Sequence, residues 1–135
     1  MGTVIRAEVS KNSKYYINKH RYYELKHYCM QYDLWKKALS SINVYPDLMK
    51  HGRSNQVSNP TQSLVEKREQ YVNKIRMLDK VANAVDPVIG PYVLKGIITG
   101  LSYDALNTQD TIPCCKDVYY TTYRKFFWVL DKVRR

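Results

Sequence analysis

The stretch between Pro60 and Pro87 constrains the fold most, because it contains neither glycine nor proline. Within it, apolar residues recur at alternating spacings of four and three, which is the pattern of a coiled-coil seam. The seam consists of Leu64, Tyr71, Ile75, Leu78, Ala82 and Val85, and Arg68 interrupts it. This pattern predicts a long connecting helix over residues 61–85, about 37 Å in length. Such a helix either packs along its own domain or pairs with a second copy in a homodimer.

Short breaks divide the last third of the chain into three predicted helices. Gly100 is a helix stop, and Ser102 after it is able to cap the next helix. Residues 111–113, Thr-Ile-Pro, form a second break. We therefore expect helices over residues 88–98, 102–109 and 115–132. Two short helices followed by a longer one predict a three-helix helix-turn-helix domain over residues 86–135.

The last predicted helix has an apolar face and a polar face when it is projected at helical periodicity. The apolar face, which should pack on the preceding helices, carries Tyr119, Tyr123, Phe126, Leu130 and Val133, with Val118, Phe127 and Val129 at its flanks. The polar face suits DNA. Arginine can form two hydrogen bonds with guanine O6 and N7, threonine can contact a thymine methyl group or a phosphate, and lysine binds phosphates. Base-reading residues cluster in the N-terminal half of a recognition helix. The candidate DNA-binding residues are therefore Lys116, Asp117, Tyr120, Thr121, Arg124 and Lys125.

Trp128 lies on the same polar face, where an exposed tryptophan is uncommon. We therefore expect Trp128 to make a protein contact, with the segment 18–42, with a second subunit or with another protein.

The N-terminal half predicts two further helices and a loop. Residues 1–17 are expected to be flexible, and residues 18–42 to form a helical hairpin with Asn18 and Asp33 as helix caps. Its apolar positions are Tyr22, Leu25, Cys29, Leu34, Trp35, Ala38, Leu39 and Ile42. Residues 43–60 are rich in turn-forming residues, which predicts a loop or linker. Together these elements predict an all-α protein.

The chain is strongly basic, with 22 Lys and Arg against 12 Asp and Glu and a net charge of +10. This balance favours an anionic partner, nucleic acid before anionic lipid, although a basic surface also serves solubility alone. The three cysteines, of which Cys114 and Cys115 are adjacent, form no disulfide framework and fit a reducing cytoplasm. A signal peptide or a membrane span would need a longer apolar run, so we expect no membrane association.

One group of residues could hold a metal: His20, Glu24 and His27 fall on one face of the first predicted helix. They have no evident fourth ligand, and surface side chains in weak ion pairs are the simpler interpretation. The sequence also has no glycine-rich phosphate loop and no nucleophile elbow. We therefore expect no enzymatic activity, no metal and no cofactor.

The same residues carry a family resemblance. Residues 100–106 (Gly-Leu-Ser-Tyr-Asp-Ala-Leu) and 117–127 (Asp-Val-Tyr-Tyr-Thr-Thr-Tyr-Arg-Lys-Phe-Phe) resemble the helix-turn-helix of region 4 in bacterial sigma factors. They are more similar still to the phage late-gene transcriptional activators of the RinA and ArpU families. Residues 20–29 and 112–120 are similar to small phage and prophage proteins of Gram-positive gut bacteria. The sequence departs from the family pattern at residues 107–110, Asn-Thr-Gln-Asp, which lengthens the expected turn.

The resemblance implies a phage or prophage protein that binds double-stranded DNA sequence-specifically and regulates transcription in the cytoplasm of a bacterial host, next to host RNA polymerase. One alternative is an anti-defence inhibitor, similar to an anti-CRISPR protein, that binds a host nuclease or its nucleic acid. The 13 tyrosines suit such an interface, but the charge of +10 argues against DNA mimicry. A DNA-recognition subunit of the packaging machinery is the third hypothesis.

Overall fold

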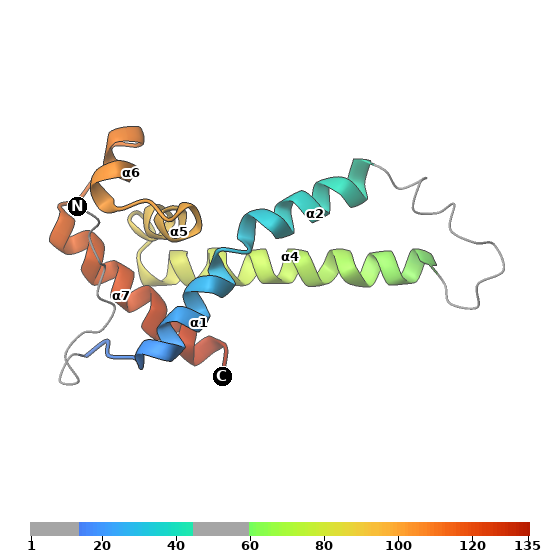
Figure 1. Ribbon diagram of the computed structural model, residues 1–135, viewed down its shortest axis with the longest axis horizontal. Helices are drawn as coiled ribbons and strands as arrows, with labels where there is room; N and C mark the ends of the chain where they lie inside the picture. The colour runs from blue at the N-terminus through green and yellow to red at the C-terminus, as the bar shows by residue number, and fades with distance from the viewer. Residues whose placement is uncertain (1–13, 45–59) are drawn as a thin grey trace. The chain divides into compact units, whose positions relative to one another are not determined.

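The computed structural model describes residues 14–44 and 60–135 of the chain (Figure 1). In these residues the fold is all-α and contains no strand, which confirms the predicted class. The helices are Lys19–Cys29 (α1), Tyr32–Val44 (α2), Pro60–Val85 (α4), Gly90–Thr99 (α5), Tyr103–Gln109 (α6) and Lys116–Val133 (α7). The predicted flexible terminus and the predicted loop lie mostly outside the described residues.

The chain divides into two compact units, which we describe separately. The first unit comprises Met1–Gln31 and Leu78–Arg135, and the second comprises Tyr32–Met77. The two helices expected over residues 18–42 are present as α1 and α2, but they belong to different units. Their packing as a hairpin therefore stays a prediction.

Local signals in the sequence account for the helix ends around α5 and α6. Gly100 adopts the left-handed conformation with φ of 75°, and its N–H donates to the Gly96 carbonyl, which ends α5. The Ser102 side chain then accepts a hydrogen bond from the Ala105 N–H at 3.3 Å, as a helix cap does. The predicted break at Gly100 and Ser102 is therefore confirmed, and so is the predicted break at residues 111–113, which lie between α6 and α7. In contrast, α5 starts two residues later than expected, with Pro91 in its first turn.

Before α5, Asp86 organises the connection from α4. Its carboxylate accepts hydrogen bonds from the backbone N–H groups of Ile89 at 2.8 Å and Val88 at 2.9 Å. These backbone hydrogen bonds lower the pKa of Asp86, and Lys125 of α7 adds to the effect through its charge. Asp86 thus stays ionised in the folded chain and closes the turn that joins the two helices.

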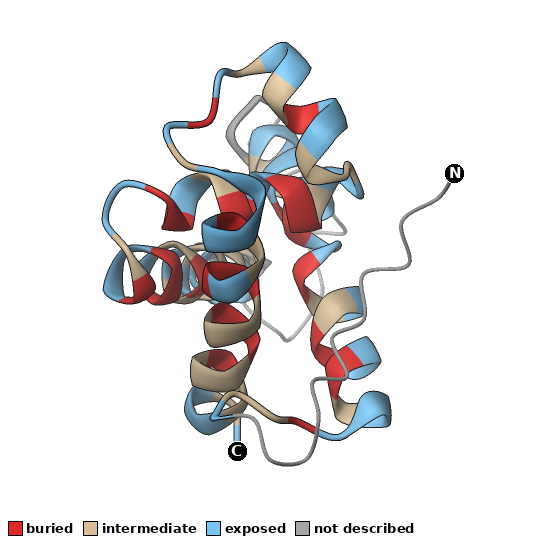
Figure 2. Cartoon of the chain, turned by 90° about the vertical axis from the view of Figure 1, so that its left-hand side faces the viewer, coloured by how far each residue is buried: buried red, intermediate tan, exposed pale blue. Residues whose placement is uncertain are grey.

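The core of the first unit is built around α7, which packs against α1, α5 and α6. Figure 2 shows that buried residues recur in successive turns of this helix. Fully buried side chains come from every helix of the unit and include Leu25, Cys29, Leu78, Ile97, Leu106, Phe126 and Leu130. A buried hydrogen bond of 2.8 Å joins the hydroxyls of Tyr22 in α1 and Tyr123 in α7. The core therefore joins residues about a hundred positions apart.

Two glycines permit close approaches in this core. A Cβ atom on Gly90 would lie 1.8 Å from the carbonyl oxygen of Ala82 in α4. A Cβ atom on Gly96 would lie 2.1 Å from the hydroxyl of Tyr119 in α7. The Tyr119 hydroxyl is buried and has no hydrogen-bond partner within the described part of the chain. The absence of a side chain at both glycines therefore sets how closely α5 packs on its neighbours.

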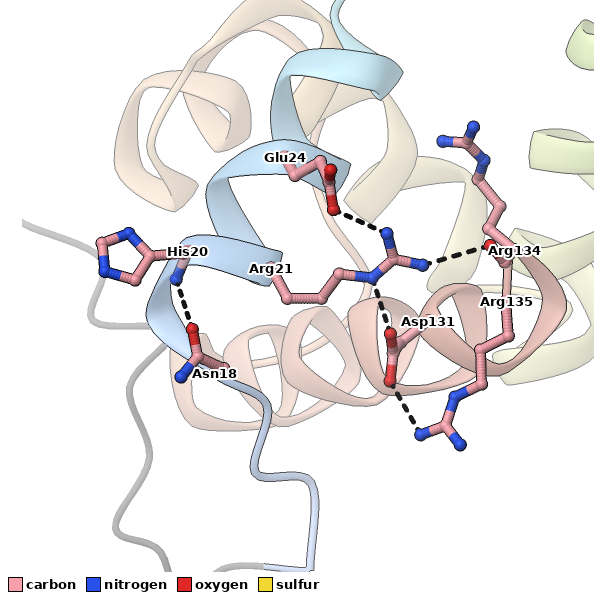
Figure 3. Close-up of polar contacts among 7 residues, drawn as sticks. All are labelled: Asn18, His20, Arg21, Glu24, Asp131, Arg134 and Arg135. Carbon is pink, nitrogen blue, oxygen red and sulfur yellow. Dashed lines mark hydrogen bonds and ion pairs between the residues drawn. The ribbon is translucent and has the colours of Figure 1, made fainter.

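Arg21 in α1 fastens the C-terminal end of α7 (Figure 3). Its guanidinium donates to Asp131 at 2.7 Å, to Glu24 at 2.6 Å and to the Arg134 carbonyl at 3.2 Å. Burial disfavours the charge of Asp131, but the hydrogen bonds from Arg21 and Arg135 outweigh burial and lower the pKa of this carboxyl. The network satisfies a free carbonyl at the helix end and fixes the direction in which α7 runs.

The second unit is less well packed along its helices. Trp35 in α2 is only 4% exposed, and the Lys74 ammonium of α4 lies 5.5 Å from the centre of its ring. Leu34, which the sequence placed on the apolar side, is 61% exposed, so that prediction is wrong. The spacing of apolar residues shows which side of a helix they share, but a residue on that side is buried only where another element covers it.

Candidate nucleic-acid interface

The turn before α7 is held by side chains of α6 and of the turn itself. Ile112 is buried, and its N–H donates to the Asn107 side-chain oxygen at 2.8 Å. The Tyr103 hydroxyl donates to the Cys114 carbonyl at 2.6 Å. Of residues 107–110, where the sequence departs from the family pattern, the first three lie inside α6 and Asp110 is its C-cap. The connection that leads into α7 is therefore anchored to α6 at two points.

The buried face of α7 follows the predicted period with three exceptions, Thr122, Val118 and Val133. Tyr119, Tyr123, Phe126 and Leu130 are buried as expected. Phe127, predicted at the flank, is also buried, and so is Thr122, which the sequence did not assign to this face. Val133, predicted in the core, is 51% exposed because it lies beyond Leu130, the last buried residue of the helix. Val118, predicted at the flank, is 47% exposed because the first turn buries only Tyr119. The N-terminal end of α7 therefore protrudes further from the core than its apolar residues suggest.

The candidate DNA-binding residues divide into two groups by their exposure. Lys116, Asp117 and Thr121 are exposed, whereas Tyr120, Arg124 and Lys125 are half-buried. The Lys116 ammonium forms an exposed ion pair of 3.3 Å with Asp104 of α6, which is a weak interaction in water. The Thr121 hydroxyl donates to the Asp117 carbonyl at 2.9 Å, which leaves the threonine methyl free for contacts. These residues share one end of α7.

Tyr120 has an internal role. Its hydroxyl accepts a hydrogen bond of 3.0 Å from the backbone N–H of Tyr103, the first residue of α6. Its ring also makes edge contacts with the rings of Tyr119 and Tyr123. The first N–H groups of a helix have no acceptor within the helix, so moving this hydroxyl away would leave the Tyr103 N–H without a hydrogen bond and would cost free energy. The structure thus places Tyr120 with the residues that join α6 to α7.

Arg124 and Lys125 are the two cations of the set that form no ion pair in the described residues. Across residues 14–44 and 60–135, neither side chain forms an ion pair with a carboxylate. Asp110, the acidic residue of the preceding turn, pairs with Lys95 of α5. Lys125 is near enough to Asp86 to lower the pKa of that carboxyl, but the hydrogen bonds of Asp86 come from the backbone N–H groups of Ile89 and Val88. The exposed face of α7 therefore carries net positive charge.

Trp128 lies further along α7 and is half-buried. Its ring meets that of Tyr15 edge to face, with centroids 5.6 Å apart, and the Lys132 ammonium lies 4.3 Å from its centre. The protein contact expected for Trp128 therefore includes Tyr15, three residues before the segment 18–42. Sequence reasoning missed Tyr15 and its neighbour Lys14, because a short polar segment before the first helix has no period to reveal its contacts.

Neither a metal group nor a membrane helix is found in the described ranges. Glu24, one of the three residues on the first helix that could ligate a metal, pairs with Arg21. Among residues 14–44 and 60–135, no cluster of three or more His, Cys, Asp or Glu is placed to hold a metal ion. In the same residues, no helix has the length and apolar content to cross a membrane.

Comparisons of this chain with protein-family models, with curated proteins and with solved structures found no match.

Proposed function

We propose that this chain is a phage-encoded transcriptional regulator that binds double-stranded DNA with the exposed face of α7. The observation that carries the proposal is the pair Arg124 and Lys125, whose charges have no carboxylate partner in the described residues, beside the exposed Lys116, Asp117 and Thr121. Arginine and lysine in this setting are suited to base edges and phosphates. The resemblance to the RinA and ArpU families supplies the link to transcription.

In this proposal α5, α6 and α7 act as a helix-turn-helix, with α7 in the major groove. The packing of α7 on both α5 and α6 supports it. The connection formed by residues 110–115 is longer than the turn of about three or four residues that is usual in this motif. The proposal therefore rests on the exposed face of α7 and not on the turn.

Within the face, the side chains take different tasks. Arg124 is the residue best suited to read a base, since its planar fork matches the two acceptors of guanine. Lys116 and Lys125 contact phosphates, and the methyl group of Thr121 meets a thymine. Asp117 sits in the first turn of α7, where it stabilises the helix dipole and accepts from a cytosine amino group. Tyr120 is left out of the reading set because its hydroxyl is engaged by Tyr103.

The protein acts in this account in the cytoplasm of a bacterial host, without a cofactor and without catalysing a reaction. The inhibitor hypothesis drew its support from the tyrosines, and several of these have a structural role. Tyr22, Tyr119 and Tyr123 are buried in the first unit, and Tyr32 is buried at the start of α2. These four of the 13 tyrosines are thus core residues and give no support to a protein interface.

The test compares two double variants, each of which removes two neighbouring cations from one helix. The variant Arg124→Ala with Lys125→Ala should lower affinity for duplex DNA and flatten the dependence of log K on log salt by about one to two. The control variant, Lys36→Ala with Lys37→Ala, removes the same charge from an exposed site on α2. Fluorescence anisotropy between about 50 and 200 mM salt measures both slopes. Equal slopes for the two variants, or an unchanged slope for the first, would contradict the proposal.

A further inference from the structure

Four side chains of the first unit form a row in which two ammonium groups flank two aromatic rings. The Lys14 ammonium lies 5.6 Å from the centre of the Tyr15 ring, which meets Trp128 edge to face at 5.6 Å. The Lys132 ammonium lies 4.3 Å from the centre of the Trp128 ring on the same helix. Both lysines are exposed and both rings are half-buried. We refer to these four residues as the Lys14–Lys132 row.

The row continues the exposed face of α7. Thr121, Arg124, Trp128 and Lys132 are separated by three or four residues, so they lie above one another on one side of the helix. Lys132 follows Arg124 by eight residues, which is about 12 Å along the helix axis. The row therefore begins where the proposed DNA-reading residues end.

Two features leave the row positively charged. Asp131, the acidic residue next to Lys132, is bound by Arg21 at 2.7 Å and by Arg135 at 3.3 Å. A lysine that lies over an aromatic ring keeps its N–H donors for other acceptors, since the ring attracts the charge through its face. The rings thus hold the two ammonium groups in place, which lowers the entropy that each lysine loses when it binds an anion.

We propose that the Lys14–Lys132 row is a contact site for the phosphate backbone of duplex DNA. The inference rests on the proposed function. When the N-terminal half of a helix lies in a major groove about 12 Å wide, its C-terminal half emerges beside the phosphates at the edge of that groove. Lys132 and Lys14 then bind phosphates, and the indole N–H of Trp128 is a further donor at the same edge. Trp128 thereby has a role in fixing the register of α7 on DNA.

The test uses the full chain and the variant Lys14→Ala with Lys132→Ala. Because phosphate contacts carry no sequence information, affinity should fall about equally for duplexes of different sequence, and the salt slope should flatten by about two. Arg124→Ala alone should differ, with a loss that depends on the sequence of the duplex. The variant Lys36→Ala with Lys37→Ala is the charge-matched control and should leave the slope near that of the unaltered chain.

The outcomes separate this inference from the proposed function. If the unaltered chain binds no duplex DNA, both are wrong. If it binds DNA and the lysine variant has an unchanged salt slope, only the inference is wrong.

Vesicles that contain phosphatidylserine form a second arm of the test, since lysine beside tryptophan and tyrosine also suits a lipid surface. A loss of vesicle binding with unchanged DNA binding overturns the inference in favour of a membrane contact. Lys14→Gln with Lys132→Gln repeats the test if the alanine variant unfolds at lower temperature.

Discussion

The two halves of the α4 seam have the same apolar pattern but different environments. In the first unit, Leu78 and Ala82 are 0% and 1% exposed, whereas Leu64, Tyr71 and Ile75 in the second unit are all half-buried. The spacing of four and three runs through both halves, and Arg68 in the second unit is the one seam position that is not apolar. Periodicity therefore identifies which residues share a helix face, while the burial of that face depends on how many other elements cover it.

The largest effect should come from truncating the seam in each half. Leu78→Ala removes a fully buried side chain and should lower the free energy of unfolding by about 3 kcal/mol, because it leaves a cavity. Leu64→Ala, at the equivalent seam position in the second unit, should cost about 1 kcal/mol. Urea unfolding followed by circular dichroism measures both. Equal costs would mean that the two halves of α4 are equally well packed, against the comparison above.

Gly96 tests the close approach that distinguishes the first unit. Gly96→Ala brings a methyl group against the Tyr119 hydroxyl and should destabilise the chain by about 2 kcal/mol. Tyr119→Phe removes the hydroxyl, and the new methyl group then meets the ring carbon at an ordinary contact distance of 3.5 Å. The double variant should therefore be at least as stable as Tyr119→Phe alone, since alanine favours a helix. Equal costs of Gly96→Ala in both backgrounds, from thermal unfolding, would rule out this clash.

Alkaline pH should weaken the first unit. Burial raises the pKa of Cys29 to about 12, and it also raises the pKa values of Tyr22 and Tyr123. The stability that these neutral groups contribute is present below their unfolded pKa values, and it is lost as pH rises from about 9 for the thiol and about 10 for the tyrosines. Each group that ionises only in the unfolded chain contributes about 1.4 kcal/mol per pH unit.

The measurement is the urea midpoint between about pH 8 and 12. Tyr22→Phe with Tyr123→Phe removes both partners of the buried hydrogen bond and should make the midpoint depend less on pH. A midpoint that is constant over this range in the unaltered chain would show that the tyrosines are not buried as described.

The smallest effect should come from Asp131. Its pKa is lowered, so the stability it contributes is present above about pH 4 and is lost as pH falls through its folded-state pKa. Asp131→Asn should cost about 1 kcal/mol at neutral pH and should reduce the loss of stability in acid. Glu24→Gln, which alters the more exposed partner of Arg21, is the control and should cost less. A larger cost for Glu24→Gln would contradict the anchoring role of Asp131.

Local signals made the helix boundaries predictable. Pro60, Gly100 and Ser102 act within a few residues of their position, and the structure places helix ends at each of them. Most of the buried face of α7 also followed from its period, because Tyr119, Tyr123 and Phe126 recur at helical spacing. These features require no knowledge of the partner elements.

Contacts between distant residues could not be predicted in this way. The hydrogen bond that engages Tyr120 comes from Tyr103, 17 residues away, and the contact that holds Trp128 comes from Tyr15. The ion pair between Arg21 and Asp131 spans 110 residues. A single sequence shows which groups can form such contacts, but the choice of partner is made by the packing of the helices.

The most direct test of the central claim is a titration of the isotopically labelled chain with a short duplex DNA at low salt, followed through the backbone amide resonances. We expect the largest shifts in the first three turns of α7, at Asp117, Thr121 and Arg124, with smaller shifts at Trp128 and Lys132. Residues Tyr32–Met77 should be unaffected. Shifts that are confined to Tyr32–Met77, or that spread evenly over all exposed lysines, would contradict the claim that α7 binds DNA.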